Sequence, residues 1–511
     1  MEQKRTSFEF LLSDEMLAVE MNAEYLGVSR LQMMENAGST IVREICKRFT
    51  PDSCQVVIFS GMGGNGGDGF VTARHLSAIG FDVLVVLVGR PELISNYATM
   101  ANWEILEAMG DTVQLVIAHD SSLIPEYAAD VYVDSLLGIG MKGPLRPPIL
   151  QAVQMLNKCT GFKLAVDVPS GVEADTGLIE NDAFEADLTI TFHKVKPGLL
   201  KASEYVGELV VGNVGIPYEA EYRAGPGDVF LIQKPRRAES HKGDFGRVLV
   251  IGGNETYTGA PALVALAALR TGVDVTYVAA PNKTAHDISS ISPDLITIKL
   301  MGDHLNSNNI TELMEYIEKV DVVVAGPGLG THNETVEAIN EIIPYIEESG
   351  KALLLDADAI KSFSQLQKPL KIPTVFTPHK GEFVVLTGSE LPIELQNKIK
   401  CVGYEAEKLG VTILLKGHED IISDGNRTKI NLTGNPGMTV GGTGDVLAGI
   451  VGGLLAQGID PFRAAVAGAF VNGAAGDFAV DVFGFHIKAS DLINMIPSVI
   501  DDPMFHKTLI E

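Results

Sequence analysis

The chain has 511 residues and a formal net charge of −26, from 39 Lys and Arg against 65 Asp and Glu. Hydrophobic residues make up 46% and charged residues 20%, as in soluble globular proteins, which excludes wholesale disorder and predicts two or more domains. The negative charge argues against nucleic acid or an anionic membrane surface as a partner, because both need a basic footprint on the protein.

The cysteines and the N-terminal segment indicate the cellular compartment. None of the four cysteines belongs to a CxxC pair, so reduced thiols are the expectation. The segment MEQKRTSFEFLLSDEM has no apolar signal core, and no uninterrupted apolar stretch reaches the roughly 18 residues of a membrane-spanning helix. We expect a cytoplasmic protein.

In the first half of the chain, short β-branched runs alternate with helical patterns, which is typical of parallel α/β layers. The runs are nearly continuous in apolar residues, as expected for strands covered by helices on both faces. The predicted strands are Val56–Ser60, Val83–Val88, Val113–Ala118, Val131–Asp134, Leu164–Val168 and Leu188–Phe192.

The second half repeats this alternation after a polar segment rich in Pro and Gly, residues 217–244, which is the best candidate for a domain boundary. The predicted strands are Arg247–Gly252, Asp274–Ala279, Val322–Ala325, Leu353–Asp356, Thr374–Thr377 and Thr412–Lys416. We therefore expect two doubly wound α/β domains, residues 1–220 and 225–511, each with its ligand site at the carboxyl ends of its strands.

The first predicted strand runs directly into a glycine-rich segment, GMGGNGGDGF (Gly61–Phe70), and then a helical pattern. Glycines let a backbone turn tightly and approach a phosphate, and the following helix N-terminus favours anions. A simple tight turn is the alternative. The polar Asn65 and Asp68 within the segment favour a ligand-binding loop.

Polar residues also stand at two later strand ends. Asp134 ends one strand and is followed by LLGIGMKGP, and Asp167 and Ser170 follow another in VDVPSGVEADTG. A carboxylate there points into the ligand crevice, where burial can bring its pKa into a range useful for proton transfer. Each Asp alone could be a turn cap, but three polar strand ends beside glycine-rich turns favour one shared site.

These motifs, followed by TFHKVKPG and GNVGIP, make residues 1–220 resemble the NAD(P)H-hydrate epimerase domain, with a Rossmann-like sheet. That family interconverts the R and S forms of hydrated NADH and NADPH. The resemblance implies Asp167 as the acid/base group and Asn65, Asp134 and Ser170 as ligands of a potassium ion, to which such oxygen donors are suited. It implies substrate contacts at Gly64, Asn65, Gly66, Gly67, Asp68, Gly138, Ile139, Gly140, Met141, Lys142, Gly143, Pro144 and Asp167.

The sequence specifies the contacts expected at Gly64 and Lys142 less closely than the others in this first site. Family loops often read NNGGDG, whereas this chain has Gly64 at the first Asn, which puts that side-chain contact in doubt but not the backbone cradle. Lys142 could contact a substrate phosphate or simply be solvated, and the sequence favours neither.

The most informative segment of the second half is NPGMTVGGTGDVLAGIVGGLLAQG, residues 435–458. Its glycines form a turn before an apolar helix, so free N–H groups and the helix dipole create an anion hole at Gly442, Thr443 and Gly444. Asp445 at the helix start can accept a hydroxyl proton while charge develops on a transferring phosphoryl group. An ordinary first-turn acid is the alternative.

This GGTGD element resembles the ribokinase-type kinase superfamily, so we expect a ribokinase-like sheet. The motifs HKGDFGRVLVIGGN, TGAPALVALAALRTG, AGPGLG, LDADAI, TPHKGEF, LLKGHED and ASDLINMIP narrow the resemblance to the ADP-dependent NAD(P)H-hydrate dehydratase. In that family the hydroxyl of the S hydrate is phosphorylated and the phosphate leaves, giving NAD(P)H, AMP and phosphate.

The resemblance implies that Asp445 is the catalytic base. The hydrated nucleotide would contact Ala260, Gly328, His379 and Asp445. The adenine nucleotide would contact Lys416, Gly417, His418, Glu419, Asp420 and Gly444. Asp356 and Asp358 would shape the crevice, with helix caps as the alternative.

Some expectations rest on less specific grounds. ADP is preferred over ATP because an epimerase fused to a dehydratase resembles the bacterial arrangement, and Mg²⁺ is expected because phosphoryl transfer usually needs charge neutralisation. A homo-oligomer is expected for an enzyme of this size. The alternative function is an ATP-dependent small-molecule kinase carrying a non-catalytic N-terminal binding module.

Overall fold

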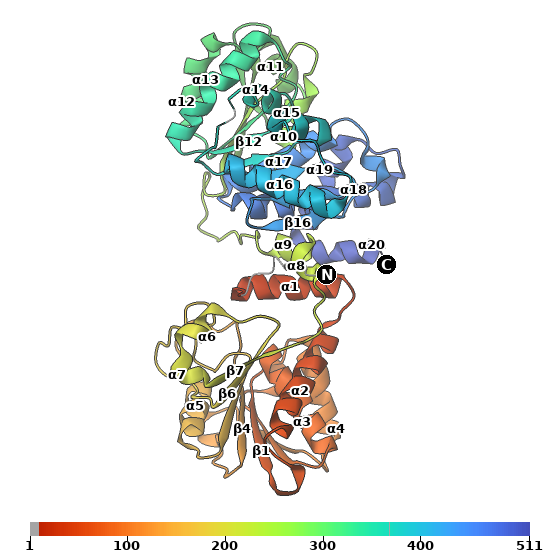
Figure 1. Cartoon of the computed structure of the whole chain (residues 1–511). Coiled ribbons are helices and arrows are strands. Elements are labelled where there is room, and N and C mark those ends of the chain that lie inside the picture. The colour runs from red at the N-terminus through yellow and green to blue at the C-terminus, as the bar shows by residue number, and fades with distance from the viewer. Residues whose placement is uncertain (1–9, 367, 511) are drawn as a thin grey trace. The chain divides into compact units, whose positions relative to one another are not determined.

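The structure is a computed structural model that describes residues 10–366 and 368–510 (Figure 1). The chain divides into two compact units between Tyr218 and Glu219. The outer limits expected for the two domains, residues 1 and 511, lie outside the described residues.

The first unit is built on a seven-stranded, fully parallel sheet of order β3-β2-β1-β4-β5-β6-β7. Its strands are β1 (Gln55–Ser60), β2 (Asp82–Leu87), β3 (Gln114–Ile117), β4 (Val131–Ser135), β5 (Phe162–Val166), β6 (Leu188–Phe192) and β7 (Glu208–Gly212). The strand order reverses between β1 and β4, which is where a doubly wound sheet opens its ligand crevice. The Rossmann-like prediction is confirmed, and β7 is the strand that the sequence pattern did not predict.

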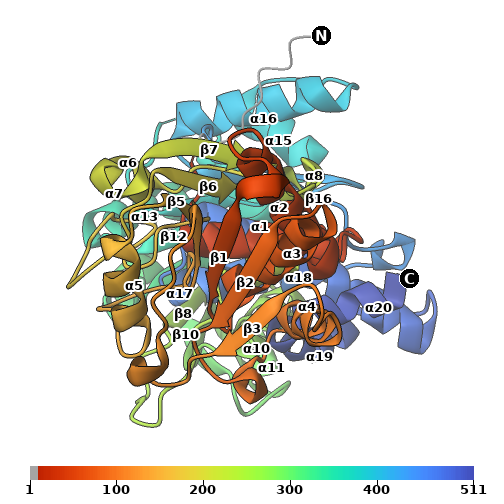
Figure 2. The ribbon, with the colours of Figure 1, turned by 90° about the horizontal axis from the view of Figure 1, so that it is seen from below.

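Helices cover both faces of this sheet, and alternate strand residues show which helix covers which face. Val56 and Ile58 of β1 pack with α2 (Arg30–Cys46), α3 (Gly64–Ala78) and α4 (Tyr97–Ala108). The intervening strand residues pack with α5 (Ile149–Lys158). Figure 2 shows α5 on the opposite side of β1 from the other three helices. The remaining helices are α1 (Ser13–Tyr25), α6 (Pro197–Lys201) and α7 (Ser203–Val206).

The second unit has a nine-stranded sheet of order β10-β9-β8-β11-β12-β13-β14-β15-β16, parallel except for the antiparallel pairs β14–β15 and β15–β16. The strands are β8 (Arg247–Ile251), β9 (Val275–Pro281), β10 (Ile296–Leu300), β11 (Val322–Ala325), β12 (Ala352–Leu355), β13 (Thr374–Phe376), β14 (Thr412–Leu415), β15 (Asp420–Ser423) and β16 (Thr428–Asn431). Its switch point lies between β8 and β11. The prediction of a second doubly wound sheet is confirmed, although it did not include β10, β15 or β16.

Two groups of helices cover this second sheet. One face carries α12 (Ile310–Ile317), α13 (Asn333–Ser349), α14 (Ala357–Phe363), α15 (Lys380–Thr387) and α16 (Leu395–Leu409). The small-residue helices α10 (Gly259–Arg270) and α17 (Thr443–Ala456) pack together, α17 lies along β11 and β12, and α18 (Pro461–Phe483) and α19 (Ala489–Asp501) follow. The remaining helices are α8 (Glu219–Tyr222), α9 (Pro226–Phe230), α11 (Asn282–Ser289) and α20 (Lys507–Ile510).

Helix α18 is the one helix among the described residues that is long and apolar enough to cross a membrane by length and composition. Within its most apolar window, 67% of the residues are buried inside the protein. A core helix of a globular domain has this property, and α18 accordingly packs against α17, α19 and the strands β13–β16.

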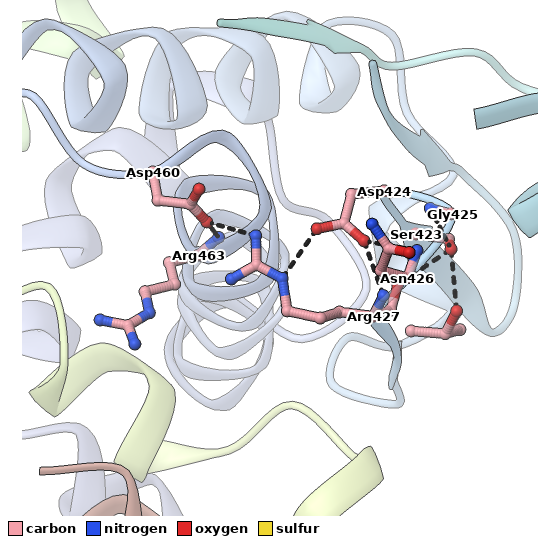
Figure 3. Close-up of polar contacts among 8 residues, drawn as sticks. Ser423, Asp424, Gly425, Asn426, Arg427, Asp460 and Arg463 are labelled. Atoms are coloured by element: carbon pink, nitrogen blue, oxygen red, sulfur yellow. Dashed lines mark hydrogen bonds and ion pairs between the residues drawn. The ribbon is translucent and has the colours of Figure 1, made fainter. Parts of the chain in front are cut away.

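The hairpin of β15 and β16 is fixed to the start of α18 by one arginine (Figure 3). Arg427 donates to Asp424 within the hairpin turn at 2.7 Å and to Asp460, the residue before α18, at 2.8 Å. The Arg427 guanidinium also lies 4.4 Å from the ring centre of Phe462. These contacts fix the antiparallel strands β15 and β16 at the edge of the sheet. The segment that leads into β15 begins just after Lys416.

Candidate active sites at the carboxyl ends of the two sheets

The glycine-rich segment after β1 is helical over most of its length, which corrects the prediction of a loop. Helix α3 begins at Gly64, so Gly64–Asp68 form its first turns. A Cβ atom on Gly66 would overlap the carbonyl oxygen of Gly61, and one on Gly69 would lie 2.6 Å from the hydroxyls of Ser60 and Ser135. These glycines therefore let α3 approach the strands closely. In the sequence, glycine-rich segments usually indicate turns, so this packing role was not predicted.

Gly64 differs from its neighbours. An added Cβ there would have only the Asn96 side chain within reach, at 4.0 Å, and the residue has no positive φ. The position can therefore accept a side chain, so the departure from the family pattern is not imposed by packing.

Asn65, Asp134 and Ser170 lie together at the switch point of the first sheet. The Ser170 backbone N–H and hydroxyl each donate to the Asp134 carboxylate at 2.7 Å. The Asn65 amide donates to the carbonyl of Leu137 at 2.8 Å, and the Leu137 N–H donates to Ser170 Oγ at 3.0 Å. The structure thus brings the three expected cation ligands into one hydrogen-bonded group.

This group contains an unpartnered carbonyl oxygen and a buried carboxylate. Asn65 Oδ1 is buried and has no hydrogen-bond partner among the described residues. Burial raises the pKa of Asp134 to about 6, against the hydrogen bonds from Ser170 and Leu136 that lower it. A buried carboxylate and an orphaned carbonyl oxygen are costly to keep, so the group offers oxygen donors to a further partner.

Asp167 follows β5 in a left-handed conformation, with φ of 63°. Such strain in a non-glycine residue concentrates at functional sites. Lys196 donates to Asp167 Oδ1 at 2.6 Å and is buried, and the Thr191 hydroxyl and the Phe192 N–H donate to the same oxygen at 3.1 and 3.3 Å. All three donors converge on Oδ1, so the carboxylate is held in a fixed orientation.

Sequence reasoning missed Lys196 and Glu20. Lys196 stands in the motif TFHKVKPG, between β6 and α6, and this motif was the available signal. Glu20 comes from α1, which is tied to this edge by the bond from Leu11 N–H to the carbonyl of Val195 and by Ser13, which donates to Asp175.

The carboxylates of Glu20, Asp68 and Asp167 interact electrostatically. Burial raises the pKa of Glu20 to about 7, and the charge of Asp167 raises it further while Lys196 lowers it. Burial also raises the pKa of Asp68 well above its usual range, with Asp167 and Glu20 adding to the effect. The site therefore holds two carboxyl groups with raised pKa values beside Asp167, which suits acid/base chemistry.

The segment after β4 lies at the same edge. A Cβ atom on Gly138 would be 3.4 Å from Asn65 Cβ, so the segment starts against the first turns of α3. Ile139 packs with the buried cluster around Val168, and Lys142 is exposed.

In the second unit, Asp445 lies in the first turn of α17. Gly442, which has φ of 99°, precedes the helix. Burial raises the pKa of Asp445 to about 7, the negative charge of Asp356 raises it further, and Lys416 opposes them. A pKa near neutrality is suited to a general base.

Lys416 and Asp356 form the core of this site. Lys416 Nζ lies 2.8 Å from Asp356 Oδ1, and the Thr377 hydroxyl donates to the same oxygen at 2.8 Å. A Cβ atom on Gly444 would lie 3.4 Å from Lys416 Nζ, so the lysine reaches the anion hole. Asp356 makes no side-chain cap to α14, which excludes the helix-cap alternative for this residue.

His379 has a structural role at the start of α15. Its Nδ1 accepts the N–H groups of Gly381 and Glu382 at 2.9 and 3.2 Å, which caps the helix. A bridge between the backbones of His379 and Lys416 places it beside the phosphate-binding candidate, and the side chain remains 59% exposed.

The other predicted contacts divide into two places. Gly328, with φ of 67°, lies against Ala260: a Cβ on the glycine would be 3.5 Å from that of the alanine, at the switch point. In the segment after Lys416, Asp420 accepts from the Gly417 N–H at 3.0 Å and from Asn431 at 3.0 Å, so it shapes the turn, while His418 is exposed.

Comparison with known proteins covers both units. A family model described as YjeF-related protein N-terminus matches residues 30–198, and one described as NAD(P)H-hydrate dehydratase matches residues 248–498. Bifunctional NAD(P)H-hydrate repair enzymes from Pyrobaculum aerophilum and Methanothermobacter thermautotrophicus are 47% and 44% identical to this chain. The matches cover 96% and 95% of this chain and 98% and 94% of those proteins.

Among solved structures, an ADP/ATP-dependent NAD(P)H-hydrate dehydratase from Bacillus subtilis is 25% identical, covers 55% of this chain and 98% of its own, and has a TM-score of 0.47. A ribokinase-like superfamily protein from Enterococcus faecalis is 29% identical over 55% of this chain and 95% of its own, with a TM-score of 0.49. The full-length relatives favour nucleotide repair over a small-molecule kinase with a silent N-terminal module. The chain belongs to the family of bifunctional NAD(P)H-hydrate repair enzymes, which confirms the resemblance seen in its motifs.

Proposed function

We propose that residues 1–220 epimerise hydrated NADH and NADPH, and that residues 225–511 dehydrate the S epimer with ADP as phosphoryl donor, giving NAD(P)H, AMP and phosphate. The observation that carries the proposal is Asp445, a base with a pKa of about 7 at the glycine-rich start of α17, beside Lys416. Phosphorylation of a hydroxyl requires a proton acceptor and an anion site. Asp445 would be the proton acceptor, and the start of α17 with Lys416 would be the anion site.

In the first domain, the reaction inverts the carbon that bears the added hydroxyl. Asp167 is proposed to exchange a proton with the substrate through Oδ2, because Lys196, Thr191 and the Phe192 N–H all bind Oδ1. Glu20 and Asp68, with raised pKa values, are placed to hold protons near neutral pH. The N-terminal turn of α3 and Gly138–Pro144 would receive the substrate's anionic groups.

Asn65, Asp134 and Ser170 are proposed to hold a potassium ion. The buried, unpartnered Oδ1 of Asn65 and the buried Asp134 carboxylate fit a hard monovalent cation. When bound, the ion would balance the charge of Asp134 and attract the substrate's phosphate.

In the second domain, Asp445 is proposed to remove the proton from the substrate hydroxyl as its oxygen attacks the β-phosphorus of ADP. The N–H groups of Gly442, Thr443 and Gly444 would bind the developing negative charge. Lys416 would bind a phosphate, and His379, whose backbone pairs with that of Lys416, would contact the substrate. Ala260 and Gly328 would line the substrate's place. Loss of the phosphate, together with a proton from the neighbouring ring carbon, then restores the double bond of the dihydropyridine ring.

ADP and Mg²⁺ belong to the same proposal. The adenine nucleotide would contact residues 416–420 and Gly444. Mg²⁺ would enter on the nucleotide phosphates and neutralise their charge, and the carboxylate of Asp356 beside Lys416 is an oxygen donor of the kind that Mg²⁺ prefers.

The test uses a mixture of R and S hydrated NADH with ADP and Mg²⁺, and follows the recovery of reduced-nicotinamide absorbance. Full recovery supports both activities. If only the S fraction is recovered, and the R fraction follows no faster than its spontaneous epimerisation, the epimerase assignment is overturned. Failure with ADP and success with ATP would overturn the choice of donor, and failure with both would overturn the function.

We also propose a homo-oligomer in the cytoplasm. Large apolar side chains are exposed near the end of α18, which supports a subunit contact there: Val482, Phe483, Phe485 and Phe505 are 60%, 48%, 67% and 54% exposed. Sedimentation of the purified chain tests the oligomeric state, with a monomer contradicting it.

A further inference from the structure

We propose that His304, His332 and Glu334 form a binding site for a divalent transition-metal ion of the Zn²⁺ class. The three side chains lie within the second unit and outside the residues assigned to substrate, nucleotide or Mg²⁺. Their ligand atoms all lie within 4.8 Å of one another.

The topology of the second sheet brings these residues together. His304 follows β10, and His332 and Glu334 begin α13, which follows β11. Parallel strands place these following segments at the same edge of the sheet, so residues about 30 positions apart become neighbours. The arrangement is thus set by the fold rather than by a local sequence motif.

The contacts within the cluster are close. His304 Nε2 lies 2.8 Å from Glu334 Oε2, and the rings of His304 and His332 lie with centroids 3.9 Å apart and 36° between their planes. The two rings and the carboxylate thus present imidazole nitrogens and carboxylate oxygens close to one another. A metal ion in place of the proton between His304 and Glu334 would bind all three side chains.

The donor set indicates the class of ion. Two imidazole nitrogens and one carboxylate oxygen are borderline ligands that suit Zn²⁺ and its neighbours in the first transition series, with a fourth position left for water. Ca²⁺ and Mg²⁺ prefer sets made of oxygen alone. With metal–ligand bonds of about 2.0–2.2 Å, the ligand atoms of a tetrahedral site lie about 3.3–3.6 Å apart. The His304–Glu334 pair, at 2.8 Å, would therefore open slightly, and the widest separation in the cluster, which is at most 4.8 Å, would close.

The surrounding backbone is already fixed, which lowers the entropic cost of forming the site. The Thr335 hydroxyl, buried in α13, donates to the carbonyl of Leu305 at 3.0 Å and so joins the two segments that carry the ligands. Asn306 donates to the carbonyl of His304 at 3.1 Å. The side chains of His304 and Glu334 are 28% and 58% exposed, so an ion can reach them and they can adjust.

His332 needs the largest adjustment. Its Nδ1 accepts the N–H of Glu334 at 3.3 Å, longer than the usual distance for such a bond. The ring can therefore be released to ligate the ion at small cost to α13. A bound ion would also hold the segment between Gly328 and His332, which carries a proposed substrate contact.

The test is a titration of the full-length, chelator-treated protein with Zn²⁺ by calorimetry, and with Co²⁺ by its visible absorption. We expect one ion per chain at this site and a cobalt spectrum typical of mixed nitrogen and oxygen ligands. His304→Ala and His332→Ala should each weaken binding at least tenfold, and Glu334→Gln should weaken it less.

His286→Ala is the matched control, since His286 is an exposed histidine on the neighbouring helix α11. Its binding should equal that of the parent chain. The proposal would be overturned if binding were unchanged in both His304→Ala and His332→Ala, or if His286→Ala lost binding to the same extent. It would also be overturned if the parent chain bound no ion in the titration. Circular dichroism of each variant excludes misfolding, and because the readout is binding, failure here leaves the repair function untouched.

Discussion

Lys416 and Asp356 form an ion pair at the carboxyl edge of the second sheet, with Nζ 2.8 Å from Oδ1 and the side chains only 21% and 3% exposed. The pair acts on a third group: burial is the main reason that the pKa of Asp445 is raised, Asp356 raises it further, and Lys416 lowers it. The proposed base is thus influenced by its burial and by two opposite charges, which follow β12 and β14 on either side of β13, and the pH dependence of dehydration reports their balance.

Asp445→Asn should abolish dehydration, because the amide cannot accept the substrate's proton. In the parent chain, the pKa of about 7 predicts that kcat/KM for dehydration falls about tenfold per pH unit below neutrality, since only the ionised carboxylate acts as base. The R-to-S interconversion of the hydrate, measured by chromatography, should be unchanged in the variant because it belongs to the first unit, and circular dichroism checks that the second unit is folded. A pH-independent rate between pH 5 and 7 would contradict the assignment of Asp445.

Lys416→Met should move the acidic limb of that profile to higher pH, because the cation that lowers the pKa of Asp445 is gone. Leaving Asp356 buried without its partner should also cost about 3 kcal/mol of folding free energy or more. Lys416→Arg keeps the charge and is the matched control, with the limb expected near its original pH. An unmoved limb in the methionine variant, measured at saturating nucleotide, would show that Lys416 does not influence the base.

Substitutions at Gly66 and Gly64 distinguish a packing role of the glycines at the start of α3 from a role in ligand binding. Gly66→Ala should destabilise the first unit by about 3 kcal/mol or more, because the new methyl group overlaps the carbonyl oxygen of Gly61. Gly64→Asn should change stability by less than about 0.5 kcal/mol, since that position is open. Urea unfolding curves of both variants provide the comparison, and equal losses would contradict the packing argument.

The parallel strands and the strand-end carboxylates were predictable because each leaves a local pattern in the sequence: apolar runs, glycine-rich turns and an acid at the tip. The partnership of Lys196 with Asp167 was not, since it joins residues 29 positions apart on neighbouring strand ends. Glu20 was hidden for the same reason, as it enters the site on α1. The helical state of Gly64–Asp68 was mispredicted because glycine signals a turn locally, whereas here its small size is used for packing.

Asp167→Asn is the sharpest test of the epimerase site. Asn tolerates the left-handed backbone at φ of 63° better than Ala, so the substitution removes the carboxylate while keeping the conformation. We expect epimerisation to fall to the spontaneous rate while dehydration of purified S hydrate is retained. Thr191→Val is the matched control, because it removes one of the three donors to Oδ1 and leaves Lys196 in place; it should reduce the rate only modestly. Normal epimerisation by Asp167→Asn would transfer the acid/base role to Glu20 or Asp68, the other carboxyl groups with raised pKa values in this site.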